Sequence, residues 1–241
     1  TAFEYRKFHV KGYQVLLIVL TDESGNDFSI LDSTINEVKR TKATVFVMGP
    51  VSPFGRNQMN VKWTDEKTKD VLYLPVERGP ESLMIENVRV PRWDPKLKNA
   101  LFSSGFGPYA LARLTRESNG IYFMFNDGNI PGPHFEVTDM LEHTPDYVSV
   151  AKYHNLINKS PIRKAVLKVA QASSTAGIQP KTKFLAAGIQ FDVRDELRSL
   201  QKISEFLDRT LVELRTVEQF RDRETSKRWQ AHYVLLMGQI L

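Results

Sequence analysis

Three short, uninterrupted apolar runs constrain the fold of this chain more than any other feature. They occupy residues 15–20, 44–48 and 121–125, and polar or turn-forming residues border each of them. Continuous runs of this length are typical of strands buried on both faces of a parallel sheet, whereas a strand with one solvated face alternates polar and apolar residues. We therefore expect three strands that are covered by protein on both sides.

Helical patterns precede the second and third runs. Phe28, Leu31, Ile35 and Val38 are spaced by three, four and three residues, which is the stripe of an amphipathic helix. A second helical pattern covers residues 108–118 and is followed by Asn119-Gly120, a common C-cap signal. This alternation predicts an α/β, Rossmann-like fold built on a parallel sheet.

An insertion at about residues 57–95 separates the two halves of this pattern. Within it, apolar runs at 71–76 and 83–90 flank the turn-forming segment Arg78-Gly-Pro-Glu81, which predicts a β-hairpin. Pro75 predicts that the first of these strands is an edge, because proline cannot donate to a strand ladder.

The chain becomes helical after residue 134. Ser160-Pro161 is typical of an N-cap followed by the first helical residue, and apolar residues recur at spacings of three and four from Leu197 to Val217. In the last helical pattern Trp229 and Tyr233 lie one turn apart, which favours a core stripe over a stacking platform for a ligand. The prediction is an α/β domain at residues 1–134 and a helical extension at 135–241.

An acidic loop follows the first apolar run. Since ligands of open parallel sheets bind at the carboxyl ends of the strands, Asp22 is well placed as a ligand of a hard cation such as Mg²⁺. Thr21 and Glu23 belong to the same loop, although strand geometry would turn Glu23 away from Asp22. The alternative for Asp22 is a carboxylate that accepts hydrogen bonds from loop amides.

Helix capping is the expectation for Asp27, the third acid of this loop. Asp27 directly precedes the helical stripe, and Ser29 with Asp32 approximates a capping box. The loop would then divide its acids between a metal ligand and a helix cap.

Composition excludes several kinds of site. The chain has 241 residues, a formal net charge of +5 and no cysteine, so disulfides, zinc–thiolate sites and thiol nucleophiles are excluded. The basic residues are dispersed, which disfavours nucleic acid as a partner. The five histidines show no ligand-pair or triad spacing, no apolar run is long enough to span a bilayer, and the sequence favours no compartment.

The segment Leu20-Thr-Asp-Glu-Ser-Gly-Asn-Asp27, followed by a helix and a strand that ends at Gly49-Pro50, resembles the central part of a von Willebrand factor type A (vWA) domain. The segment 46–56, the segment 109–123 and the closing Arg228-Trp-Gln-Ala-His-Tyr233 are similar to bacterial vWA proteins with a helical C-terminal extension. Glu23 stands where that family usually has glycine.

The resemblance implies that Asp22 lies in the third loop of a metal-ion-dependent adhesion site. That family carries Asp-x-Ser-x-Ser in an earlier strand, and no such motif occurs after Thr1. We therefore expect this chain to be the second half of a vWA domain, with Mg²⁺ bound in the intact domain and not by this fragment.

The resemblance also implies a function. It favours a non-enzymatic module that binds a protein ligand, with no catalytic residues of its own. The alternative is a metal-assisted hydrolase that uses Asp22 with Asp127 or Glu23 at the edge of the sheet, although no nucleophile or base accompanies them in a recognisable pattern.

Overall fold

The computed structural model describes residues 7, 11–25, 27–86, 102–125, 136–175 and 193–241. The chain divides into two compact units. Unit 1 comprises Thr1–Ile85 and Leu101–Tyr153, and unit 2 comprises Glu86–Ala100 and His154–Leu241. The predicted mixed α/β architecture with a parallel sheet is confirmed.

Unit 1 contains a three-stranded parallel sheet. Its strands are β1 (Leu16–Leu20), β2 (Thr44–Pro50) and β5 (Tyr122–Phe125), in the spatial order β1-β2-β5. Leu16 pairs with Thr44 and Met48 pairs with Phe123, so the carboxyl ends of the strands meet at one edge of the sheet. All three strands coincide with the three apolar runs.

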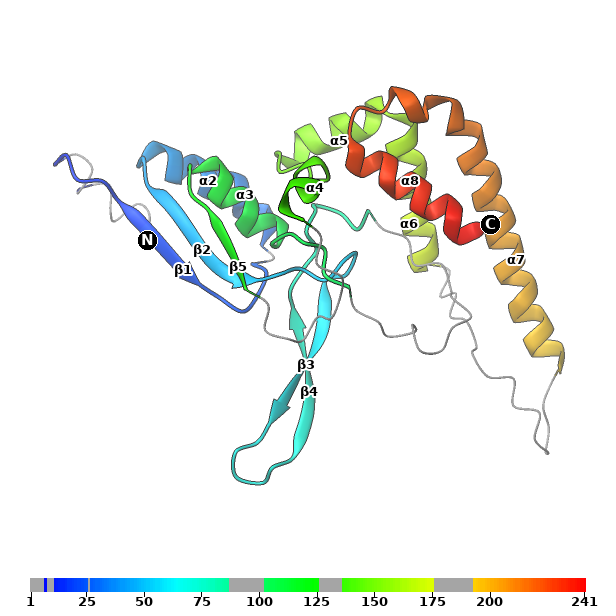
Figure 1. Ribbon diagram of the computed structural model, residues 1–241, viewed down its shortest axis with the longest axis horizontal. Coiled ribbons are helices and arrows are strands. Elements are labelled where there is room, and N and C mark those ends of the chain that lie inside the picture. Colours follow the sequence, from blue (N-terminus) through cyan, green and yellow to red (C-terminus); the bar gives the residue numbers. More distant parts are fainter. Residues whose placement is uncertain (1–6, 8–10, 26, 87–101, 126–135, 176–192) are drawn as a thin grey trace. The chain divides into compact units, whose positions relative to one another are not determined.

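Both helices that connect these strands cover the same face of the sheet. They are α2 (Phe28–Arg40) and α3 (Tyr109–Glu117), and they pack against each other (Figure 1). Val38 of α2 joins Val45 and Val47 of β2 in a buried cluster, against which Leu111 of α3 packs. Because the chain advances across the sheet in one direction, right-handed crossovers place both helices on one side.

The opposite face of the sheet is exposed, so the prediction of strands buried on both faces is wrong. Its exposed side chains come from all three strands: Leu16, Ile18, Leu20, Met48, Phe123 and Phe125, with exposed fractions from 38% to 73%. The apolar runs were correct as strands, but only the residues that alternate with these, such as Leu17 and Val19, face the helices.

The insertion forms a hairpin with a different strand pairing from the one predicted. Strand β4 (Val71–Glu77) is the expected strand, but it pairs with β3 (Gln58–Thr64), not with the later run. The turn lies at residues 65–70, where the Asp65 carboxylate accepts hydrogen bonds from the amides of Lys67 and Thr68. Residues 83–86 form no strand, and residues 87–90 lie outside the described residues.

Two shorter helices follow the sheet in the chain: α4 (Val137–Glu142) and α5 (Val150–Lys159). Helix α5 begins in unit 1 and ends in unit 2. The hydroxyl of Tyr109 in α3 donates to the carbonyl of Val148, just before α5. Tyr109 is fully buried, so this bond satisfies a phenol in the core of unit 1.

Unit 2 is helical, as expected from the sequence. It contains α6 (Pro161–Thr175), α7 (Val193–Val217), a 3₁₀ helix η2 (Glu218–Arg223) and α8 (Lys227–Ile240). Trp229 and Tyr233 are buried to 0% and 2% exposure, which confirms the predicted core stripe. Ser160 precedes α6 and accepts a hydrogen bond from the Arg163 amide, as its predicted N-cap role requires. No described helix is both long enough and apolar enough to cross a bilayer.

Candidate functional site

The candidate site lies at the carboxyl ends of the parallel strands, where the loop after β1 begins. The amide of Thr21 donates to the carbonyl of Met48 at 3.1 Å, which extends the β1–β2 ladder by one bond. The amide of Ser24 donates to the carbonyl of Glu77 at 2.9 Å, which ties the loop to the end of β4. Asp22 and Glu23 therefore lie between two backbone anchors.

A side-chain turn shapes the loop between these anchors. The hydroxyl of Thr21 accepts a hydrogen bond from the Glu23 amide at 3.1 Å and donates to the Glu23 carbonyl at 3.3 Å. The side chains of Asp22 and Glu23 are both exposed. The loop thus presents Asp22 to solvent, while the Thr21 hydroxyl is already engaged within the loop.

Asp22 has no cluster of other metal-binding groups around it in the described part of the chain. No group of three or more histidine, aspartate or glutamate side chains that could hold a metal ion occurs there. Mg²⁺ needs six oxygen ligands in octahedral geometry, of which one or two are usually carboxylates. Asp22 is therefore a single exposed carboxylate in the described part of the chain, and its predicted role as a metal ligand stays a prediction.

Asp27 occupies the predicted N-cap position of α2, but it makes no hydrogen bond to the helix amides. Its carboxylate accepts a hydrogen bond from the Ser29 hydroxyl at 2.6 Å. Asp32 pairs with Arg113 of α3 at 2.5 Å and takes no part in a capping box. Asp27 thus takes the predicted N-cap position without the expected side-chain bond to the helix. The predicted capping box of Ser29 and Asp32 is wrong, because α2 begins at Phe28 and Ser29 already lies within the helix.

Asp127, the partner of Asp22 in the alternative hydrolase, lies outside the described residues. The hydrolase hypothesis thus stays a prediction from the sequence.

Three loop residues near the ends of β1, β2 and β4 have buried polar side chains that the sequence patterns did not reveal. Ser24 and Ser52 are 3% and 0% exposed, and among the described residues their hydroxyls have no hydrogen-bond partner. Arg78, which follows β4 directly, is 4% exposed. No periodicity marks these residues, because they lie in loops, and only their proximity to strand ends could have suggested them.

Tyr122 of β5 fixes the end of β2. Its hydroxyl donates to the Pro50 carbonyl at 2.9 Å. Burial raises the pKa of this phenol, and the nearby Arg78 guanidinium only partly opposes the shift. Tyr122 is therefore a permanent donor near neutral pH. A Cβ at Gly49 would lie 2.3 Å from this hydroxyl, which explains the glycine at the end of β2.

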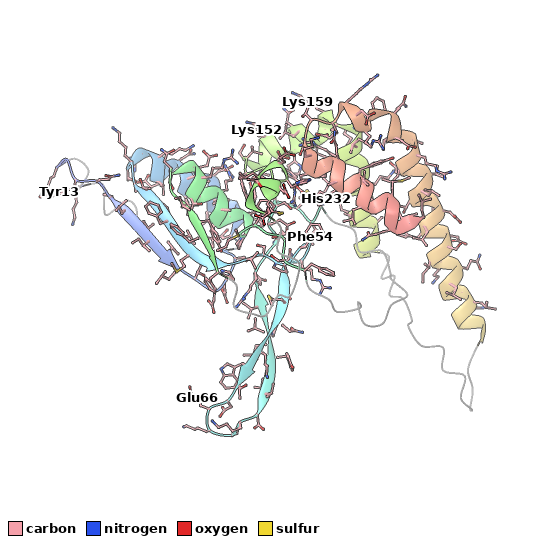
Figure 2. All side chains as sticks on the ribbon, in the orientation of Figure 1. Tyr13, Phe54, Glu66, Lys152, Lys159 and His232 are labelled. Carbon is pink, nitrogen blue, oxygen red and sulfur yellow. The ribbon has the colours of Figure 1, made fainter. Side chains whose placement is uncertain are left out.

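Unit 2 contains a buried ionic cluster that was also missed. Arg228 of α8 donates to the Glu86 carboxylate at 2.6 Å, and the Nε2 atom of His232 lies 3.5 Å from the same oxygen (Figure 2 labels His232). Burial opposes ionisation of Glu86, but Arg228 and His232 outweigh it and lower the pKa of the carboxyl from 4.5 to about 2. Such a carboxylate holds no exchangeable proton near neutral pH, so the cluster is suited to a structural role.

A second buried pair lies in the same unit. Arg163 donates to both carboxylate oxygens of Glu224, at 3.0 and 2.8 Å, and its guanidinium lies 5.3 Å from the Trp229 ring centroid. Burial of Glu224 opposes its ionisation, yet the hydrogen bonds from Arg163 and Ser160 hold the pKa of that carboxyl below its ordinary value. Two buried arginines of unit 2, Arg163 and Arg228, are thus each paired with a buried carboxylate.

Comparisons with known proteins add no family to this description. No protein-family model, curated protein or solved structure matches the chain.

Proposed function

We propose that this chain is part of a protein-binding module of the vWA type, in which Asp22 contributes one ligand to a metal-assisted binding site. A single observation carries the proposal. Asp22 follows a strand of a parallel sheet directly, between the backbone anchors at Thr21 and Ser24, and its side chain is exposed at the edge where ligands of such sheets bind.

The organisation of the sheet supports the same proposal. A strand, a helix and a strand precede the insertion, and α3 with β5 extends the sheet by one further parallel strand. This order agrees with the portion of a vWA domain that the sequence resembles. Strand β1 lies at the edge of the three-stranded sheet, so one more strand could pair with it in a longer protein.

Mg²⁺ would supply a positive charge to which a carboxylate of the protein ligand could bind. Among the described residues, Asp22 would hold the ion, and the remaining oxygens would come from a preceding segment that carries Asp-x-Ser-x-Ser and from the ligand itself. One carboxylate with water binds Mg²⁺ weakly. The 241-residue chain is therefore expected to bind the ion with no better than millimolar affinity.

The test compares two neighbouring carboxylates in a longer protein that includes the sequence encoded before Thr1. Asp22→Asn should weaken Mg²⁺ binding at least tenfold by isothermal titration calorimetry, whereas Glu23→Gln, which removes the same charge one residue away, should change it less than twofold. Equal effects of both variants would contradict the assignment of Asp22. A preceding sequence without Asp-x-Ser-x-Ser would contradict the vWA assignment itself.

A further inference from the structure

The face of the parallel sheet opposite α2 and α3 is an exposed apolar surface. Six large side chains contribute to it: Leu16, Ile18, Leu20, Met48, Phe123 and Phe125. The rings of Phe46 and Phe123 stack with their centroids 6.3 Å apart, which joins β2 and β5 across this face. Monomeric soluble proteins rarely leave such a surface open to water.

The size of this face can be compared with what a stable interface requires. Large apolar side chains each present roughly 200 Å² when fully exposed, and these six are 38% to 73% exposed. Together they leave roughly 650 Å² of apolar surface on one copy. Two such faces would bury about 1,300 Å² in total, which lies within the range of specific protein interfaces, roughly 1,200–2,000 Å².

The lack of charged residues on this face also permits self-association. The strands β1, β2 and β5 contain no charged residue. A face that meets its own copy across a twofold axis brings identical groups together, so any charge on it would be repelled by its equivalent. The absence of charge from these strands removes that penalty, and two flat sheet faces can pack about 10 Å apart with interdigitated side chains.

We propose that this face binds a second copy of the chain, face to face, in a twofold symmetric dimer. This face is a different surface from the proposed ligand site, which lies at the carboxyl ends of the strands. Met48 lies on the central strand β2, so the two Met48 side chains would lie close to the twofold axis.

The first experiment measures the mass of the full chain by analytical ultracentrifugation at micromolar concentrations. The wild-type chain should sediment as a dimer, and Ile18→Glu should raise the dissociation constant at least 100-fold, because each dimer would bury two new charges. Leu141→Glu is the matched control, since Leu141 is 66% exposed and Ile18 is 68% exposed, but Leu141 lies on α4. Leu141→Glu should leave the dimer intact.

A second experiment does not depend on disrupting the interface. The natural chain has no cysteine, so Met48→Cys introduces a single thiol. Mild oxidation should join two copies of this variant through a disulfide between their introduced thiols, whereas Val212→Cys on the exposed face of α7 should give at least tenfold less cross-linked product.

Several results would overturn the proposal. These are a monomeric wild-type chain at 50 µM, a dimer that Ile18→Glu leaves unchanged, or cross-linking that is no greater at position 48 than at position 212. A monomer in which Met48 resists oxidation by peroxide would show that another part of the chain covers the face. Binding to phosphatidylcholine vesicles in place of dimerisation would assign the face to lipid.

Discussion

At the scale of single residues, the tightest constraint in unit 1 is the contact between Gly120 and strand β2. The chain turns here from α3 into β5, and Asn119 adopts a left-handed conformation with φ of 57°. A Cβ placed on Gly120 would lie only 1.8 Å from the carbonyl oxygen of Val45. Because that atom belongs to the backbone of a central strand, it cannot rotate away as a side chain could.

The first prediction is that Gly120→Ala lowers the free energy of unfolding by about 3 kcal/mol, because the connection must move away from β2. Gly238→Ala is the control, since no atom lies within 4 Å of the Cβ position there and the residue is in a helix. That change should raise stability by about 0.5–1 kcal/mol. Urea denaturation followed by circular dichroism measures both, and equal stabilities of the two variants would contradict the prediction.

The second prediction concerns the pH dependence of the buried carboxylate Glu86. Its pKa is about 2 in the folded chain against an ordinary value of 4.5. Its contribution to stability is therefore complete above about pH 4.5 and is lost as the pH falls toward 2. Glu86→Gln should lower the free energy of unfolding at pH 7 by about 3–5 kcal/mol, because it leaves Arg228 buried without its counter-charge.

The measurement is urea denaturation of the wild type and of Glu86→Gln at pH 7 and pH 3, where the difference between them should shrink. The matched control is Glu213→Gln, which removes an exposed pair with Lys168. That change should cost less than about 1 kcal/mol at either pH. A difference between wild type and Glu86→Gln that is constant with pH would contradict the assigned shift.

At the scale of elements, the apolar residues on one face of the β3–β4 hairpin become more exposed from its base toward its tip. Met59 opposes Val76 and Trp63 opposes Leu72 in the strand register, so these side chains lie on the same face of the hairpin. Met59 is 3% exposed and packs against Val51, whereas Trp63 is 44% exposed. Figure 1 shows the hairpin extending away from the parallel sheet, and Figure 2 labels Glu66 at its tip.

The third prediction follows from this difference in side-chain exposure. Met59→Ala should lower the free energy of unfolding by about 2–4 kcal/mol, because it leaves a cavity at the base of the hairpin. Trp63→Ala removes a larger side chain but should cost less than about 1 kcal/mol, since much of it is already in water. Chemical denaturation measures both values, and a larger cost for Trp63→Ala would show that the distal half of the hairpin is covered by protein.

Several elements could be predicted from the sequence because their patterns are local. The three apolar runs gave the three parallel strands, and the spacings of three and four residues gave α2, α3 and α8. The partner of β4 was missed because the apolar run at 83–90 has a stronger pattern than the alternating residues Met59, Val61 and Trp63 of β3.

The candidate site was predicted less completely, because tertiary contacts decide it. The position of Asp22 at a strand end followed from the apolar run before it. Asp27 lost its capping role to a side-chain bond with Ser29, and no sequence pattern distinguishes the two bonds. The burial of Ser24, Ser52 and Glu86 depends on segments that are distant in sequence, so local spacing could not reveal it.

At the scale of the whole molecule, the chain consists of two compact units with different kinds of interior. The interior of unit 1 combines an apolar cluster on one face of a sheet, the contact between Tyr109 and Phe28, whose ring centroids lie 5.6 Å apart, and the buried Arg113, which pairs with the partly exposed Asp32. Unit 2 combines the buried Trp229 with the ion pairs of Arg163 and Arg228. Because ion pairing lowers the pKa of the buried Glu86 and Glu224, acid should weaken unit 2 first.

The fourth prediction is that the two units unfold in separate transitions. In differential scanning calorimetry, Gly120→Ala should lower the melting temperature of one transition and Glu86→Gln that of the other, each by several degrees for a loss of a few kcal/mol. Lowering the pH from 7 to 3 should shift the transition that Glu86→Gln affects more than the other. A single transition that both variants shift equally would show that the units unfold cooperatively.

The apolar character of both faces of β1 has a consequence for how this strand finds its place during folding. Leu16, Ile18 and Leu20 alternate with Leu17 and Val19, so a slip of one residue would exchange one apolar set for another of similar size. Burial alone therefore specifies the alignment of β1 only weakly. The alignment depends instead on the polar contacts at its end, where Thr21 bonds to Met48 and Ser24 bonds to Glu77. The hydrogen bonds of the loop that presents Asp22 therefore also fix the register of β1 against β2.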